Sequence, residues 1–526
     1  MNALELILVL MVVAAGLAVV AERLKLPYPI VLVVGGLGLA FVPGLPRVDL
    51  APDLVLLLFL PPLLFAAAWF TSWRDFAANG RAIALLAVGL VVATTTAVAW
   101  VAHALIPGMS WAVAFVLGAI VSPPDAVAAT AVTRRLKVPR RIVTIIEGES
   151  LVNDATGLVA YKFALVAVAT GSFSPTAAAG QFVLVALGGV AVGFAVAWFI
   201  AQLHRRLENF ELETVITLLT PYAAYIPAEH IGVSGVLATV TAGGYLGWHN
   251  PELLSALSRF RGRGVWSVLL LLFNGLVFIL IGLDLASIRE IISGVSFTDL
   301  LAWSAAVSAM AIAVRMIYVP VGVYLPRLIN PRLCVVENPS LKNVTLIGWT
   351  GMRGIVSLAL ALALPLTVPS GAPFPHRATI VVLSFAVIFV TLLLQGLTLP
   401  LVIRALKLEP DDADLREERD VMLRASEAAV KRLDEIDRTS IIHPQLMARV
   451  RLPYQQRLER LTEQTREDPE CRLTEGEEAA FHKLRGEALA AERKTAVTLR
   501  NEGRISEEVL HRVQEALDLE ALQPER

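Results

Sequence analysis

Long apolar runs dominate the first 404 residues of the chain, and few charged residues separate them. At the ~1.5 Å rise of an α-helix, runs of this length cross the ~30 Å hydrocarbon core of a bilayer. The apolar residues are continuous and do not alternate with polar ones, so the pattern predicts helices. Thirteen membrane spans are expected, at about 3–21, 28–45, 52–70, 82–106, 111–133, 141–169, 180–203, 211–227, 230–248, 265–287, 299–323, 343–367 and 378–404.

Two of these spans, the fifth and the twelfth, are interrupted in comparable ways. The fifth contains the sequence SPPD at 122–125, and the twelfth contains GWTGMRG at 348–354. Adjacent prolines remove backbone donors and clustered glycines weaken a helix, so both spans are predicted to be broken. Their separation fits two repeats of inverted topology, spans 1–6 and 8–13. Broken helices at matching positions of two such repeats are typical of a transport site.

Charge divides the chain into two parts. The first 404 residues hold 24 Lys and Arg with 18 Asp and Glu, whereas residues 405–526 hold 21 and 28. The pattern therefore predicts an all-α membrane domain, 1–404, followed by an acidic helical domain, 405–526. In the second part, apolar residues recur at helical spacing within 415–436 and 473–494, which indicates amphipathic helices there.

The basic residues of the loops predict the orientation of the membrane domain. Seventeen Lys and Arg lie in one alternating set of loops and three in the other, so the basic set is expected in the cytoplasm. Thirteen spans then place the N-terminus outside and the acidic domain inside. The first apolar run has no basic leader and no small-residue cleavage site, so it is expected to be a span and not a removable signal.

One span carries an unusual cluster of polar residues. Glu147, Ser150 and Asp154 fall at i, i+3 and i+7 and share one helical face, while Glu149 and Asn153 form the adjoining stripe. A carboxylate, a hydroxyl and an amide supply the oxygen ligands that a hard cation prefers. Burial disfavours the charged form of a carboxyl group, so a proton competes with a cation for it. That competition couples the movement of the two ions.

Three charged residues, Asp154, Asp125 and Arg353, are expected near the middle of the membrane, where charges are costly and by default functional. For Asp154 we favour ion transport over a structural pair with Arg353. For Glu149 we favour a structural role as the permanent counter-ion of Arg353. Asp125 is either an ion ligand or an acidic group that stabilises half-helix ends, and a site role is favoured. Arg315 has no assigned partner; it either snorkels or pairs with a buried carboxylate.

Five motifs in this order resemble the monovalent cation:proton antiporter-1 family of sodium/proton exchangers. The resemblance covers essentially the whole membrane domain and is closest to bacterial members with a cytoplasmic extension. It implies a secondary transporter of the plasma (inner) membrane, and not an enzyme, with a dimerisation domain, a core of crossed broken helices, elevator-like alternating access and a homodimer. Monovalent cations, protons and membrane lipids are its expected partners, and neither a cofactor nor nucleic acid is expected. The motifs are LPPLLF at 60–65, SPPDAVAAT at 122–130, EGESLVNDATGLV at 147–159, FILIGL at 278–283 and GWTGMRGIVSLALAL at 348–362.

The resemblance also implies roles for individual residues. Asp154 matches the ion- and proton-binding aspartate of the family, and Ser150 matches a ligand hydroxyl, so these two are expected to hold the monovalent cation. Asn153 stands where electrogenic relatives have a second aspartate, which is similar to the electroneutral members. Asp125 matches the acidic residue of the crossing in span 5.

Glu149 and Arg353 match the buried ion pair of the family, in agreement with the structural role above. The chain departs from the family pattern at two places. Alanines occupy 66–68, where many relatives carry an acidic residue in span 3. The sequence Pro-Asp-Ala at 124–126 replaces Thr-Asp-Pro, which changes the residues around the site.

The expected activity is the exchange of cytoplasmic Na⁺ for external protons, with Li⁺ and K⁺ as further candidate ions. A K⁺/H⁺ antiporter of the same fold is the nearest alternative. An intramembrane aspartyl hydrolase would need Asp125 and Asp154 to share a proton, and it is disfavoured because Asn153 and Arg353 surround them. A cation channel would conduct without proton coupling.

Overall fold

The computed structural model describes residues 3–24, 26–40, 52–136, 138–171, 175–207, 209–291, 296–329, 340–408, 413–439, 443–465, 491, 492, 494–499, 502 and 513. These residues form helices and turns, with one isolated bridge between Thr367 and Pro373 and no strand among them. The all-helical fold class is therefore confirmed. The chain forms two compact units, Met1–Asp411 and Asp412–Arg526, which are described separately.

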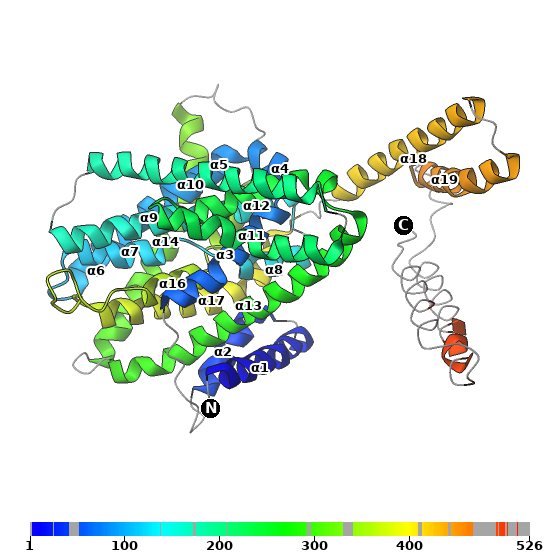
Figure 1. Cartoon of the computed structure of the whole chain (residues 1–526). Helices are drawn as coiled ribbons and strands as arrows, with labels where there is room; N and C mark the ends of the chain where they lie inside the picture. The colour runs from blue at the N-terminus through cyan, green and yellow to red at the C-terminus, as the bar shows by residue number, and fades with distance from the viewer. Residues whose placement is uncertain are drawn as a thin grey trace. The chain divides into compact units, whose positions relative to one another are not determined.

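The first unit is a bundle of long helices with shorter helices between them (Figure 1). Its elements are α1 (Ala3–Leu24), α2 (Tyr28–Leu39), α3 (Pro52–Phe70), α4 (Trp73–Ala78), α5 (Gly80–Ala84), the π-helical η1 (Leu85–Leu90), α6 (Val91–Leu105), α7 (Trp111–Val121), α8 (Ala126–Arg135), α9 (Arg140–Thr170), α10 (Pro175–His204), α11 (Phe210–His230), α12 (Gly235–Leu253), α13 (Ala256–Ile291), α14 (Phe297–Ile329), α15 (Leu341–Trp349), α16 (Ile355–Leu362) and α17 (Arg377–Leu406).

Within the described residues, seven helical stretches are long and apolar enough to cross a membrane. Each predicted span falls on a helix, on several consecutive helices or on a pair of half-helices, although 41–45 of the second span lie outside the described residues. The total of thirteen spans and the inverted repeats stay predictions. The seven stretches are Gly80–Leu105, Trp111–Thr133, Arg140–Thr170, Gly180–His204, Ser258–Leu280, Phe297–Leu325 and Arg377–Leu406.

Both predicted interruptions are present. Helix α7 ends at Val121 and α8 begins at Ala126, because the prolines between them have no N–H to donate to the preceding turn. Helix α15 ends at Trp349 and α16 begins at Ile355, and the intervening glycines lack the helical preference of other residues. Each span is thus divided into two short half-helices that leave free backbone groups at the break.

Helices α2 and α13 pack so closely that their backbones are in contact at two glycines. A Cβ atom added to Gly36 would meet the carbonyl oxygen of Ile279, and one added to Gly282 would meet that of Val33. Small residues that allow such close approach are typical of membrane helix pairs. Helix α13 also contacts the half-helix α16, and its Trp266 belongs to a second cluster of buried side chains. The α2–α13 pair therefore forms a closely packed wall beside the second broken span.

The second unit contains α18 (Ala413–Thr439) and α19 (Pro444–Thr465). Arg451 of α19 lies 2.5 Å from Asp434 and 3.7 Å from Asp437, both on α18, and Met447 is buried. The predicted helix at 415–436 lies within α18, and the one at 473–494 lies mostly outside the described residues.

Candidate ion-binding site

The two broken spans meet at their interruptions. The backbone N–H of Asp125 donates to the carbonyl oxygen of Met352 at 2.7 Å. Its carboxylate accepts from the N–H of Val127 at 2.8 Å through Oδ1 and from the N–H of Ile355 at 3.4 Å through Oδ2. One side chain thus binds the N-terminal ends of both α8 and α16. The partial positive charge of a helix N-terminus stabilises a carboxylate there, so Asp125 is held by two half-helices at once.

This arrangement explains the glycine just before α16. A Cβ atom added to Gly354 would overlap Oδ2 of Asp125. A larger residue at 354 would therefore displace the carboxylate from the N-terminus of α16. The crossing depends on the glycine for space.

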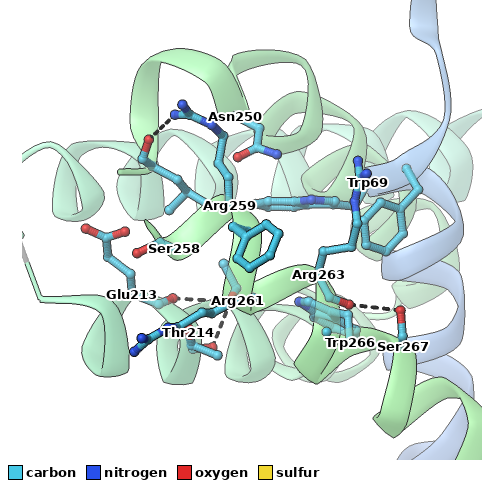
Figure 2. Close-up of a pocket in the computed structure, with 16 residues that line it drawn as sticks. Trp69, Glu213, Thr214, Asn250, Ser258, Arg259, Arg261, Arg263, Trp266 and Ser267 are labelled. Carbon is cyan, nitrogen blue, oxygen red and sulfur yellow. Dashed lines mark hydrogen bonds between the residues drawn. The ribbon is translucent and has the colours of Figure 1, made fainter. Parts of the chain in front are cut away.

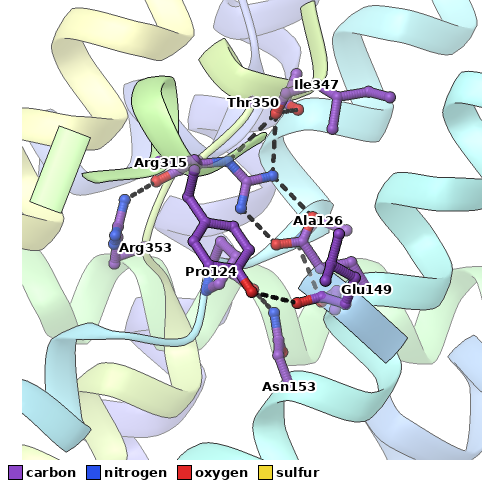
Figure 3. Close-up of polar contacts among 12 residues, drawn as sticks. Pro124, Ala126, Glu149, Asn153, Arg315, Ile347, Thr350 and Arg353 are labelled. Carbon is purple, nitrogen blue, oxygen red and sulfur yellow. Dashed lines mark hydrogen bonds and ion pairs between the residues drawn. The ribbon is translucent and has the colours of Figure 1, made fainter. Parts of the chain in front are cut away.

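Helix α9 holds the first break in place through side-chain hydrogen bonds. The amide Nδ2 of Asn153 donates to the carbonyl oxygen of Pro124 at 3.0 Å (Figure 3). The hydroxyl of Ser150 accepts from the N–H of Ala126 at 3.2 Å. Asn153 is fully buried. Because the break leaves the carbonyl of Pro124 without a helical partner, Asn153 supplies the donor that it needs.

Asp154 lies on the wall of a cavity of about 730 Å³. The residue is 7% exposed, and no described residue forms a hydrogen bond or an ion pair with its carboxylate. Asp125, Ser150 and Glu147 line the same cavity. The structure therefore brings together three carboxylates and a hydroxyl around one cavity.

The two stripes of α9 have different surroundings. Glu147, Ser150 and Asp154 line the cavity, whereas Glu149 and Asn153 do not and are buried in the protein. The cavity-facing stripe supplies the oxygen atoms that suit a cation. The other stripe connects α9 to its neighbours.

Glu149 pairs with Arg315 and not with Arg353, so the predicted partner of Glu149 is wrong (Figure 3). Arg315 Nη1 binds Glu149 Oε1, Nη2 lies 2.8 Å from Oε2, and both side chains are 1% exposed. Nε and Nη2 of Arg315 also donate to the carbonyl oxygen of Ile347, at 3.2 and 3.1 Å. The open question about Arg315 is thereby answered: it pairs with a buried carboxylate.

Arg353 is instead satisfied by backbone carbonyl groups. Its Nε donates to Val121 at 3.0 Å, its Nη1 to Gly351, and its Nη2 to Ala311 at 3.4 Å. The carbonyl of Val121 belongs to the last turn of α7, and that of Gly351 lies in the second break. Such carbonyls lack helical donors and carry partial negative charge, which is why Arg353 needs no carboxylate in direct contact.

The alanines of α3 also face the site. Ala66 and Ala67 line the cavity that contains Asp154. Where relatives carry an acidic residue, this wall presents methyl groups. The absence of that carboxylate leaves fewer oxygen ligands on the α3 side of the cavity.

Two polar residues that the sequence analysis did not select also line this cavity. Asn274 of α13 is 6% exposed and Ser357 of α16 is 1% exposed. Neither the amide oxygen of Asn274 nor the hydroxyl of Ser357 has a hydrogen-bond partner among the described residues. Each is a single polar residue in an apolar run, so no periodic pattern marks it. Their polarity inside a membrane span was the available signal.

A second pocket, of about 760 Å³, lies where α3, α11, α12 and α13 meet (Figure 2). Arg259, Arg261 and Arg263 line it, but a helix turns ~200° over two residues and their side chains extend in different directions. They therefore do not converge on one anion. Phe70, Arg263 and Ser267 line both pockets, so the second pocket adjoins the ion cavity.

Comparison of the sequence with known proteins identifies the family of this chain. Residues 7–405 match the family described as sodium/hydrogen exchanger, transmembrane. The chain belongs to this family. It is 33% identical over 528 residues to an uncharacterized Na(+)/H(+) exchanger of Mycobacterium tuberculosis, covering 98% of this chain and 96% of the relative.

Two further proteins are similar to this sodium/hydrogen exchanger. The sodium, potassium, lithium and rubidium/H(+) antiporter of Bacillus pumilus is 35% identical over 386 residues, which cover 71% of this chain and 57% of that protein. The solved structure of the sodium proton antiporter MjNhaP1 from Methanocaldococcus jannaschii matches with a TM-score of 0.59 at 20% identity, covering 77% of this chain and 98% of that chain. The structural match concerns the fold.

Membership of the family makes the chain a membrane-embedded cation/proton antiporter. Such a protein is a secondary transporter and not an enzyme. The hydrolase alternative built on Asp125 and Asp154 is therefore excluded.

Proposed function

We propose that the chain exchanges cytoplasmic Na⁺ for external protons, one for one, and that Asp154 carries each ion in turn. The observation that carries this proposal is the state of Asp154: a carboxyl group on the cavity wall, 7% exposed, with no partner among the described residues. A buried carboxylate with a structural role needs a partner, as Glu149 has in Arg315. Asp154 has no such partner and lines the same cavity as Asp125 and Ser150, so its carboxylate is available to a transported ion.

The neighbours of Asp154 support a site with one exchangeable charge. Asp125 is engaged by two backbone N–H groups, and Asn153 is neutral. Ser150 offers a hydroxyl oxygen on the same face as Asp154. In this proposal Asp154 and Ser150 bind the cation, Asp125 and Asn153 shape the site, and binding of one cation displaces one proton.

Alternating access follows an elevator-like movement of the broken spans and α9 against the wall formed by α2, α3 and α13. The cavity between these groups of helices supports that division, because residues of both groups line it. We place the basic loops in the cytoplasm and the N-terminus outside, and we assign the protein as a homodimer with a cytoplasmic helical domain.

The proposal is tested in proteoliposomes that contain the purified full chain, with proton flux measured after a Na⁺ gradient is imposed. Asp154→Asn is expected to abolish exchange while the protein remains folded. Glu213→Gln is the matched control, because Glu213 is a buried carboxylate, 1% exposed, outside the ion cavity. Undiminished exchange by Asp154→Asn, or cation flux that ignores the pH gradient, contradicts the proposal.

K⁺/H⁺ exchange is the second candidate, and two observations favour it. Alanines occupy the α3 wall, which removes a charge that would favour a small cation over a large one. The Bacillus pumilus relative is named for sodium, potassium, lithium and rubidium. Proton flux measured in separate experiments with gradients of Na⁺, Li⁺, K⁺ and Rb⁺ distinguishes the two activities. Proton exchange that is driven by K⁺ and not by Na⁺ would show that the chain is a K⁺/H⁺ antiporter.

A further inference from the structure

Asn274 is an unpaired polar residue on the cavity wall that faces α9. Its side chain is 6% exposed, and its amide oxygen is buried with no hydrogen-bond partner among the described residues. A buried amide group that stays unpaired destabilises a protein, so a position like this one requires an explanation. The cavity that Asn274 lines is the one that contains Asp154.

The wall that carries Asn274 is fixed by close packing. Gly282, two turns further along α13, lies against the backbone of α2 at Val33. Arg263 and Ser267 of α13 also line the ion cavity, but both line the second pocket as well. Asn274 lines the ion cavity without the second pocket, and it lies roughly 16 Å along the helix from Arg263. Among the described polar residues of α13 that line the ion cavity, Asn274 is therefore the farthest along the helix from the second pocket.

We propose that Asn274 is a specificity-determining ligand of the transported cation, which its amide oxygen contacts from the α13 wall while Asp154 binds from α9. The inference rests on the proposed function, because it assumes that Asp154 carries the cation. Hard cations bind carboxylate and amide oxygens together. The amide oxygen of Asn274 is buried, and a half-turn of the terminal amide, which exchanges its oxygen and nitrogen, turns it toward the cavity.

A neutral ligand at this position fits the rest of the site. Ala66 and Ala67 leave the α3 wall without an oxygen ligand, and Asn274 supplies one from the neighbouring helix. Because an amide carries no charge, it adds a ligand without adding a further titrating group to the cavity. One-for-one exchange is thereby preserved, and the geometry of the amide selects among cations.

The test compares Asn274→Ala with Asn250→Ala in proteoliposomes, with Na⁺, Li⁺ and K⁺ as probes. Asn250 is the matched control, because its amide oxygen is also unpaired among the described residues but lines the second pocket alone. We expect Asn274→Ala to raise the half-maximal Na⁺ concentration about five- to tenfold, as expected for one lost ligand. The Na⁺/K⁺ ratio of half-maximal concentrations should change, and the control should keep the unmodified values.

Two further variants keep the inference falsifiable where the alanine variant folds poorly. Asn274→Ser retains an oxygen and should fall between the alanine variant and the unmodified protein. Asn274→Asp adds a charge and should make exchange sensitive to membrane potential. The inference is overturned if the Na⁺/K⁺ ratio of half-maximal concentrations is unchanged in all three Asn274 variants. It is also overturned if the apparent affinity falls equally for every cation. Either result leaves the Asp154→Asn outcome intact, whereas an active Asp154→Asn variant overturns the proposed function itself.

Discussion

Glu149 and Arg315 form an ion pair in which both side chains are 1% exposed. The pair joins α9, which carries Asp154, to α14. Arg315 also donates two hydrogen bonds to the carbonyl of Ile347 in α15, just before the second break. One arginine therefore connects the helix of the candidate ion-binding residue to the crossing of the broken spans.

The first prediction concerns the stability that this pair provides. Arg315→Met and Glu149→Gln should each lower the free energy of unfolding by about 3–5 kcal/mol, because each leaves a buried partner unpaired. The variant with both substitutions should lose less free energy of unfolding than the sum of the losses in the two single variants. Thermal unfolding of the purified protein in detergent measures this.

A surface pair serves as the control for this prediction. Arg140 lies 2.5 Å from Asp75, with side chains 42% and 31% exposed. Arg140→Met should change the free energy of unfolding by less than about 1 kcal/mol. Equal effects of Arg315→Met and Arg140→Met contradict a stabilising role for the buried pair.

The second prediction concerns the space at the crossing. Gly354→Ala places a methyl group on Oδ2 of Asp125, so we expect at least a ~100-fold loss of exchange rate from a misplaced site. Gly264→Ala is the control, because nothing lies within 4 Å of its added Cβ. Proton flux in proteoliposomes measures both variants. A Gly354→Ala protein with the rate of the control would show that the position of Asp125 does not limit transport.

The third prediction concerns the donor at Asn153. An ionised aspartate cannot donate to the carbonyl of Pro124, whereas a protonated one can. Asn153→Asp should therefore have low activity relative to the unmodified protein at alkaline pH and recover toward acidic pH. Asn153→Ala has no donor at any pH, so its relative activity should stay low throughout. Rates of both variants across pH, each divided by the unmodified rate, test this difference.

The fourth prediction follows from competition at Asp154. As pH falls, the carboxyl group is increasingly protonated and a cation must displace the proton. The half-maximal Na⁺ concentration should therefore rise about tenfold per pH unit on the acidic side of the titration and level off on the alkaline side, by linkage. Raising Na⁺ should shift the active pH range to lower pH. A half-maximal concentration independent of pH contradicts a shared group.

The helix break in the fifth span and the shared face of α9 were predictable from the sequence, because each depends only on residue types close together in the chain. The prolines at 123 and 124 lack N–H groups wherever they stand, so the break before α8 follows from their presence. Likewise the positions of Glu147, Ser150 and Asp154 along one helix determine that they share a face, and all three line the cavity. Properties within one helix are therefore predictable from residue type and spacing.

Contacts between helices were less predictable. Glu149 and Arg315 are 166 residues apart, and their pairing depends on the rotation and depth of α9 relative to α14. The carbonyls that satisfy Arg353 become available only because the breaks expose them. Asn274 was missed because one polar residue in an apolar run does not reveal which surface it faces. The roles of Asp154, Asp125, Asn153 and Ser150 as ion-site residues stay predictions.

The carboxylate of Asp125 has a mechanical consequence. It accepts hydrogen bonds from Val127 and from Ile355, and residues 125 and 355 are 230 positions apart in the chain. Together with the bond from its own N–H to Met352, it prevents α8 and α16 from sliding past each other without breaking the crossing. We therefore expect α8 and α16 to move together as one unit. A force applied to either half-helix is transmitted to the other through one residue, Asp125.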